Sequence, residues 1–180
     1  YTGAGDKKAA LRVINNALEN DALSASGRVY LTKRRALVYF LFGDLNRAQA
    51  DIHTASKHNK LDTEILTIQA RIWAAQGREI ENAYNYAMSM IKHDPTDIVA
   101  WDTLAVVVSV REGNDEALDI LRRVGRTANS CSSLFEHLGD AYAKNGDKEL
   151  AAEAYLRAIE LSNDGLSVEP QLRKKLRKVR

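Results

Sequence analysis

Apolar and small residues recur along the chain at intervals of three and four positions, with charged residues between them. This spacing is typical of amphipathic helices. It predicts helices over residues 6–19, 28–42, 44–58, 62–76, 79–93, 97–112, 114–126, 132–145, 147–161 and 168–179. The chain has only 2 Pro and 7% aromatic residues. With abundant Ala, Leu, Arg and Glu, this composition favours an all-α fold.

The helical pattern repeats along the chain, and five glycines mark its period. The glycines are separated by 38, 34, 36 and 33 residues, and an alanine follows each within six positions. The pairs are Gly5 and Ala10, Gly43 and Ala48, Gly77 and Ala83, Gly113 and Ala117, and Gly146 and Ala151. A large ring stands four residues before most glycines (Tyr1, Tyr39, Trp73, Tyr142), and a small residue seven or eight before (Ala36, Ala70, Ala105, Gly139).

The physical interpretation is a pair of antiparallel helices in each unit, joined at the glycine. Small residues let the two helices approach closely, and glycine accepts the left-handed conformation that ends a helix. The residue after the glycine is often Asp or Asn, which is expected to cap the next helix. These residues are Asp6, Asp44, Asn114 and Asp147.

This pattern resembles the tetratricopeptide repeat. The best unit has Phe135, Leu138-Gly139, Tyr142, Gly146, Ala151, Tyr155 and Ala158 in the family's order. Trp101, Leu104 and Ala105 fit the first positions of the unit before, and Pro95 fits the family's closing proline. Arg35 and Gln69 depart from it, since Leu is usual there. The resemblance implies a right-handed α-solenoid with a half-repeat at 1–27 and repeats at about 28–61, 62–96, 97–131 and 132–165. The connection Asp21–Arg28 is longer than the period predicts.

The segment 166–180 is predicted to form a basic capping helix. Leu172, Leu176 and Val179 share one face, which would cover the exposed apolar side of the last repeat, as solenoid ends require. Residues 166–180 carry a net charge of +5, whereas the whole chain carries +2. The basic face is interpreted as solvated, with contact to nucleic acid or an anionic membrane as weaker alternatives.

Composition excludes several classes of protein. The chain is too apolar, at 45%, for disorder, and its single cysteine cannot form an internal disulfide. No apolar run approaches the length of a membrane helix. Residue 1 is Tyr, so the sequence is expected to be an excerpt. Asp102-Thr103-Leu104-Ala105 and Glu136-His137-Leu138-Gly139-Asp140 resemble the C-terminal part of longer bacterial tetratricopeptide proteins. The compartment stays open between cytoplasm and cell envelope.

The residues that carry chemistry form no convincing catalytic, cofactor or metal site. Ser132, Ser133, His137 and Asp140 lie close in sequence, but no oxyanion-hole pattern accompanies them. The favoured interpretation is that Ser132 caps a helix and that His137 and Asp140 form a solvated pair. The histidines lack zinc-like spacing, and Cys131 has no basic neighbour that would activate it.

Function is therefore expected from the surface. In the tetratricopeptide family the first helix of each pair lines the concave face. The candidate partner-binding residues are Tyr30, Lys33, Arg34, Leu37, Leu41, Thr67, Ile68, Arg71, Asp102, Val106, Glu136 and Asp140. This groove would grade from basic and apolar to acidic and orient a peptide or partner helix. Tyr30, Leu37 and Val106 could equally pack between repeats. A clamp for a C-terminal carboxylate is disfavoured, because Leu37, Val99 and Thr103 replace the residues it needs.

The resulting hypothesis is a non-catalytic scaffold or adaptor for a protein or peptide partner, without a cofactor. One alternative is a helical-repeat RNA-binding module, which the acidic body of the chain disfavours. The other alternative is a regulatory segment of a larger enzyme. Sequence alone identifies neither the partner nor the oligomeric state.

Overall fold

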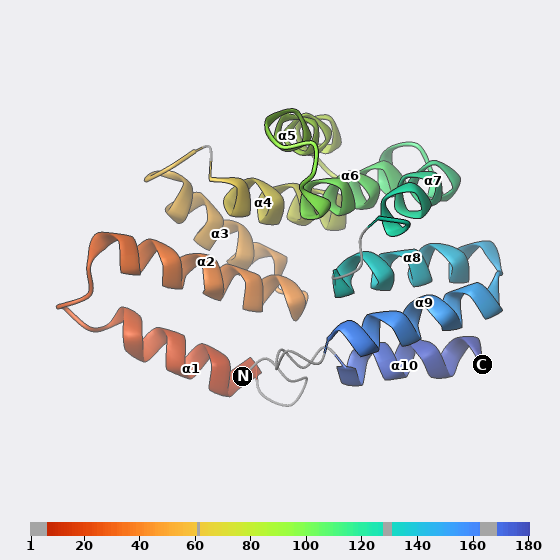
Figure 1. Ribbon diagram of the computed structural model, residues 1–180. Coiled ribbons are helices and arrows are strands. Elements are labelled where there is room, and N and C mark those ends of the chain that lie inside the picture. Colours follow the sequence, from red (N-terminus) through yellow and green to blue (C-terminus); the bar gives the residue numbers. More distant parts are fainter. Residues whose placement is uncertain (1–6, 61, 128–130, 163–168) are drawn as a thin grey trace.

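The computed structural model of the chain describes residues 7–60, 62–127, 131–162 and 169–180, and in these ranges it contains ten α-helices and no strand. They are α1 (Lys7–Leu18), α2 (Ala25–Leu41), α3 (Leu45–Ser56), α4 (Thr63–Gln76), α5 (Ile80–His93), α6 (Ile98–Arg111), α7 (Asn114–Gly125), α8 (Ser132–Asn145), α9 (Lys148–Leu161) and α10 (Glu169–Val179). Consecutive helices pack against each other and follow a curved path (Figure 1). The predicted all-α solenoid is confirmed.

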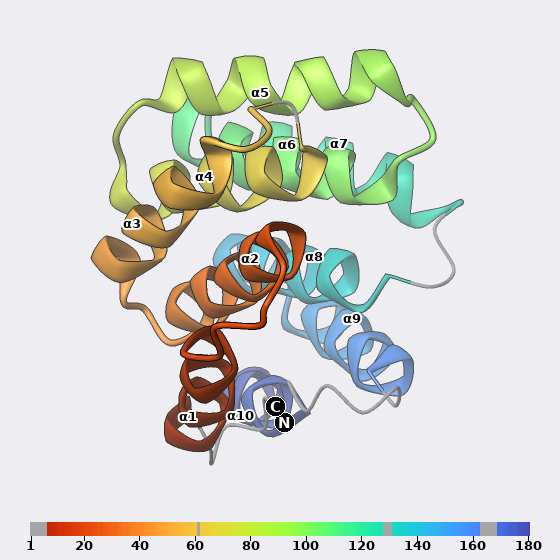
Figure 2. The ribbon, with the colours of Figure 1, turned by 90° about the vertical axis from the view of Figure 1, so that its left-hand side faces the viewer.

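The helices divide into an inner and an outer set. α2, α4, α6 and α8 form the inner set, and Figure 2 shows α2 and α8 near the centre with α3 and α5 toward the periphery. Successive inner helices contact one another directly, from α2 to α4, α4 to α6 and α6 to α8. The inner helices therefore form a continuous concave face.

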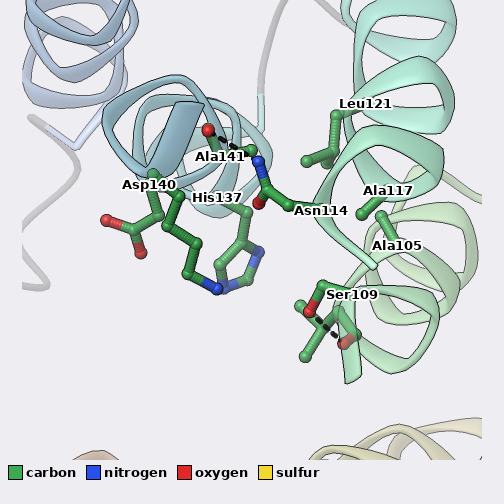
Figure 3. Close-up of a pocket in the computed structure, with 10 residues that line it drawn as sticks. Ala105, Ser109, Asn114, Ala117, Leu121, His137, Asp140 and Ala141 are labelled. Atoms are coloured by element: carbon green, nitrogen blue, oxygen red, sulfur yellow. Dashed lines mark hydrogen bonds between the residues drawn. The ribbon is translucent and has the colours of Figure 1, made fainter. Parts of the chain in front are cut away.

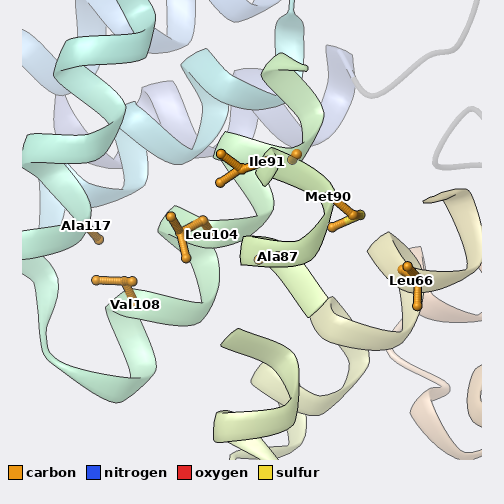
Figure 4. Close-up of a cluster of buried hydrophobic side chains, with 8 residues drawn as sticks. Leu66, Ala87, Met90, Ile91, Leu104, Val108 and Ala117 are labelled. Carbon is orange, nitrogen blue, oxygen red and sulfur yellow. The ribbon is translucent and has the colours of Figure 1, made fainter. Parts of the chain in front are cut away.

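The hydrophobic core lies between units as well as within them. One buried cluster joins Leu66 of α4, Met90 and Ile91 of α5, and Leu104 and Val108 of α6 (Figure 4). Since each unit buries part of its apolar surface against a neighbour, no unit is a complete hydrophobic core by itself. The ends of such an array must be covered, and α10 covers one of them. Leu172 and Leu176 are buried against α9, as the sequence predicts.

Small residues set the distance between the two helices of a unit. The tightest case is Gly139 of α8, where a Cβ atom would lie 2.6 Å from the ring of Tyr155 on α9. Tyr155 is only 3% exposed, so its ring has little room to move away. Glycine is therefore required at position 139, which the sequence predicts to be small, because the opposing side chain on α9 is a tyrosine.

Three of the predicted turn glycines end their helices in the left-handed region. Gly43 has φ 76°, Gly77 has φ 63° and Gly146 has φ 87°. The predicted caps after the glycines are only partly correct. Asp44 accepts a bond from the backbone of Arg47, but Asp147 makes no capping bond. Asn114 lies inside α7, and its side chain donates instead to the carbonyl oxygen of Ala141, 2.9 Å away. Gly5 and Asp6 lie outside the described residues.

The predicted start of the second helix is wrong by three residues. Ser24 caps α2 by accepting a bond from the backbone N–H of Gly27 at 3.1 Å, and the helix begins at Ala25. The extra residues of the long connection therefore lengthen α2 to 17 residues, and the expected unit boundary at 27/28 falls inside a helix. The guanidinium of Arg28 donates to the carbonyl oxygen of Leu18, at the end of α1.

Candidate partner-binding surface

The concave face is built from the residues of α2, α4, α6 and α8 that do not point into the core. Among the twelve predicted groove residues, Tyr30 and Leu41 are exposed, at 54% and 41%. Two predictions are wrong. Ile68 is 4% exposed because it packs in the core between α3 and α4, and Asp102 is 0% exposed. Neither side chain is available to a partner in this conformation.

At the N-terminal end of the face, cations of α2 pair with carboxylates at the start of α4. The ammonium of Lys33 lies 2.9 Å from Asp62 and 2.8 Å from Glu64. Arg34 also pairs with Glu64. Burial of the Lys33 ammonium opposes its charge, but the two carboxylates outweigh this and raise the pKa of Lys33. These cations therefore hold α2 to α4.

At the centre of the face, a buried carboxylate joins three units. Asp102 of α6 accepts bonds from Arg71 of α4 at 2.8 Å and from the hydroxyl of Ser133 of α8 at 2.9 Å. Its other oxygen lies 2.6 Å from Nδ1 of His137, also on α8. Arg71 donates in addition to the hydroxyl of Thr103. One side chain is thus tied to the units on both sides.

The surroundings of Asp102 stabilise its charged form. Burial alone would raise its pKa, but the charges of His137 and Arg71, with the bonds from His137 and Ser133, outweigh burial and lower the pKa of Asp102 to about 2. The geometry is not that of a hydrolytic triad. The serine hydroxyl donates to the carboxylate and not to the imidazole, so His137 is not placed to take its proton.

At the C-terminal end, one cation of the capping helix pairs with two acidic residues of α8. Lys175 of α10 lies 2.7 Å from Glu136 and 2.6 Å from Asp140. The second oxygen of Asp140 accepts a bond from the hydroxyl of Tyr155 at 2.8 Å. Burial and this bond to a carboxylate raise the pKa of Tyr155. The predicted solvated pair of His137 and Asp140 is therefore wrong, since each is bonded to another residue.

These contacts form one continuous series, here called the inter-repeat ladder. It consists of Lys33 and Arg34 with Asp62 and Glu64, Arg71 with Asp102, Asp102 with Ser133 and His137, and Lys175 with Glu136 and Asp140. Each step joins residues about one unit apart. The predicted charge gradient is consequently compensated inside the protein and does not present a row of free charges.

Apolar side chains make up much of the remaining concave surface. Besides Tyr30 and Leu41 on α2, Val99 and Val110 on α6 are 43% and 48% exposed. The guanidinium of Arg34 lies 5.1 Å from the centre of the Tyr30 ring. Leu37, Thr67 and Val106 are half-buried. Val110 was not predicted, because α6 is apolar all round and gives little periodic signal; its spacing of four from Val106 was the available clue.

Ser132 and Cys131, two further candidates from the sequence, make local contacts around the start of α8. Ser132 does not cap α8; its hydroxyl donates to the carbonyl oxygen of Ala158, 2.9 Å away, and Cys131 occupies the capping position. Cys131 is half-buried, with its sulfur 3.4 Å from the hydroxyl of Ser133.

Within the described ranges, His, Cys, Asp and Glu side chains form no group of three that could hold a metal ion. None of the described helices has the length and apolarity needed to cross a bilayer.

Comparison with known proteins supports the repeat architecture. Residues 132–164 match the family model of the tetratricopeptide repeat. The chain is similar in structure to a thermophilic tetratricopeptide repeat protein of Thermus thermophilus (TM-score 0.68, 18% identity, 84% of this chain and 80% of that one). It is also similar to a tetratricopeptide repeat protein of Parabacteroides merdae (TM-score 0.74, 16% identity, 97% and 65%).

A third similar structure is YrrB, described as a tetratricopeptide repeat protein with an unusual peptide-binding site (TM-score 0.50, 19% identity, 96% of this chain and 84% of that one). The comparison with curated protein sequences gives no match. Identities this low establish the fold alone. The chain is a helical-repeat protein with the fold of tetratricopeptide repeat proteins, and residues 132–164 are one such repeat by sequence.

Proposed function

We propose that this tetratricopeptide-fold solenoid is a non-catalytic scaffold that binds a protein or peptide partner on its concave face. Solenoids of this kind present extended concave surfaces for binding. The peptide-binding site named for YrrB, which shares the fold, is in line with this proposal.

One observation carries the proposal. The concave face leaves Tyr30, Leu41, Val99 and Val110 exposed, although the charged residues around them are used within the inter-repeat ladder. Exposed apolar side chains gathered between polar ones are typical of interaction surfaces. Aromatic residues such as Tyr30 are also enriched at the energetic centres of interfaces.

The experiment is selection of binding peptides from a displayed random library, followed by affinity measurement on variants. Tyr30→Ser and Leu41→Ser remove the exposed side chains of α2. Met88→Ser on α5 and Leu156→Ser on α9 are matched controls, because these outer residues are 40% and 39% exposed. We expect the groove variants to weaken selected peptides about tenfold or more and the outer variants to leave them unchanged.

Substitutions of Lys33 or Leu37 would test the proposal less well. Lys33 is bonded to two carboxylates, and Leu37 packs against the buried cluster between α2 and α4. A loss of binding in these variants could come from a loss of structure. If the selected peptides instead depend on the outer residues, the proposed concave site is wrong.

The RNA-binding alternative receives no support from the concave face. Its cations Lys33, Arg34 and Arg71 are paired with carboxylates of the neighbouring unit. A filter-binding series with random RNA at increasing salt separates the two functions. Strong retention that falls steeply with salt would favour RNA over a protein partner.

A further inference from the structure

A pocket of about 200 Å³ lies between α6, α7 and α8 (Figure 3). Three alanines, one from each helix, face it: Ala105, Ala117 and Ala141. Polar side chains line the rest of the pocket: Ser109 of α6, Asn114 of α7, and His137, Asp140 and Lys144 of α8. Since Val106, His137 and Asp140 also line it, the pocket belongs to the concave side of the protein.

The pocket exists because one unit lacks a side chain that the others have. At the preceding junction the same place is filled by Val107 of α6, which is 0% exposed. Val107 packs there against Ala70, Ala74 and Ala83. In the next unit, the residue equivalent to Val107 is Ala141, 34 positions further on. The residues equivalent to Ala70, Ala74 and Ala83 are Ala105, Ser109 and Ala117, 34 or 35 positions further on. The earlier units also have a large residue in this slot, Val38 and Ile72, and both are buried.

The charged side chains at the rim of the pocket differ in how far they are bonded within the protein. Both oxygens of Asp140 are bonded, one to Tyr155 and one to Lys175. His137 uses Nδ1 for Asp102, which leaves Nε2 without a partner in the described part of the chain. Lys144 is exposed and makes no ion pair with any described residue. A ligand would therefore meet three alanines beside the ammonium of Lys144, with the carboxylate of Asp140 already bonded within the protein.

We propose that this pocket receives one large apolar side chain of a partner peptide, such as leucine, next to an acidic residue that pairs with Lys144. The volume is sufficient, since an apolar cavity of about 150 Å³ holds a benzene molecule. The free Nε2 of His137 is available to the peptide main chain. This inference rests on the proposed function and specifies which peptide the C-terminal part of the concave face selects.

The test uses short capped peptides as probes and the whole chain labelled at its alanine methyl groups. Acetyl-Leu-Asp-amide is compared by NMR with acetyl-Ala-Asp-amide and acetyl-Leu-Lys-amide. We expect the first peptide to shift the methyl signals of Ala105, Ala117 and Ala141 with a dissociation constant in the millimolar range. The alanine and lysine peptides should bind several-fold more weakly.

The decisive variant is Ala141→Val, which introduces the side chain present at the equivalent position of the neighbouring unit. It should weaken binding of acetyl-Leu-Asp-amide about tenfold while leaving the melting temperature equal or higher. Ala75→Val, at an exposed position of α4, is the matched control for the same change of residue. Lys144→Glu should reverse the preference from the Asp to the Lys peptide without closing the pocket.

Two results would overturn the inference. One is that the leucine peptide causes no shift of the three methyl signals beyond that of the alanine peptide. The other is that Ala141→Val binds it as well as the unmodified chain does. The proposed function is judged separately, by the dependence of library peptides on Tyr30 and Leu41, which do not line this pocket.

Discussion

The buried carboxylate of Asp102 is predicted to stabilise the solenoid, and Asp102→Asn is the change that tests this. Asparagine keeps the shape of the side chain but removes the charge that Arg71 and His137 face. Removing one partner of a buried ion pair costs about 3–5 kcal/mol, because the other charge stays behind. Arg71 keeps a bond to Thr103 and is 15% exposed, so the lower end of this range is expected.

The role of Asp102 also predicts how the free energy of unfolding depends on pH. The pKa of Asp102 is about 2 in the folded chain and 3.8 for an ordinary aspartate. One pKa unit corresponds to about 1.4 kcal/mol, so ionised Asp102 contributes about 2 kcal/mol through this shift. A carboxyl group whose pKa is lowered by folding stabilises the fold at pH values above its pKa in the unfolded chain. The contribution is therefore complete near pH 6 and is lost as the pH falls toward 2.

The measurement is urea unfolding followed by circular dichroism and by tryptophan fluorescence. Trp73 lies on α4 and Trp101 on α6, so fluorescence reports on the units that Asp102 joins. Asp119→Asn, at an exposed position of α7, is the control. We expect Asp102→Asn to lose about 3 kcal/mol at pH 7 and the difference to narrow by about 2 kcal/mol toward pH 2. A loss under about 1 kcal/mol, or a difference independent of pH, would refute the reasoning.

Three further predictions concern the packing of the fold. Gly139→Ala should destabilise the chain by about 1–3 kcal/mol by forcing its Cβ into Tyr155, and Tyr155→Leu should relieve part of this loss in denaturant unfolding. Gly146→Ala should lower the free energy of unfolding by about 1–2 kcal/mol, because Gly146 has φ 87°, where a Cβ atom causes strain. A Gly→Ala change in the middle of a helix carries no such strain. Leu172→Asp should undock α10, which hydrogen exchange would detect as lost protection in α9 and α10 with the earlier helices unchanged.

Much of the fold could be predicted from the sequence, because its signals are local. Glycines such as Gly77 and Gly146 end helices through their own backbone freedom. The alanine after each turn lies near the start of the next helix, whose buried face is set by a spacing of three and four residues. The start of α2 was missed for a similar local reason. Ser26 and Gly27 are weak helix formers, and the cap that starts the helix at Ala25 is the single hydroxyl of Ser24.

The site could be predicted only to the level of which helices form it. The position of a residue within the repeat correctly predicts that Tyr30 and Leu41 are on the surface. It does not determine whether a charged side chain faces solvent or the next unit. Asp102 looks like a surface residue in the sequence, and it is buried because its partners Arg71 and His137 arrive from units about 30 residues away. Such pairings depend on the curvature of the whole array.

The inter-repeat ladder also means that the units are not interchangeable. Each inner helix carries side chains that complement its neighbour and not itself. If residues 62–96 were deleted to leave a solenoid one unit shorter, Leu37 would take the place of Arg71 beside Asp102. The carboxylate would then be buried against an alkyl group, which is costly. Gene duplication or loss of a single unit would therefore be penalised, and the order of the repeats is fixed by their electrostatic complementarity.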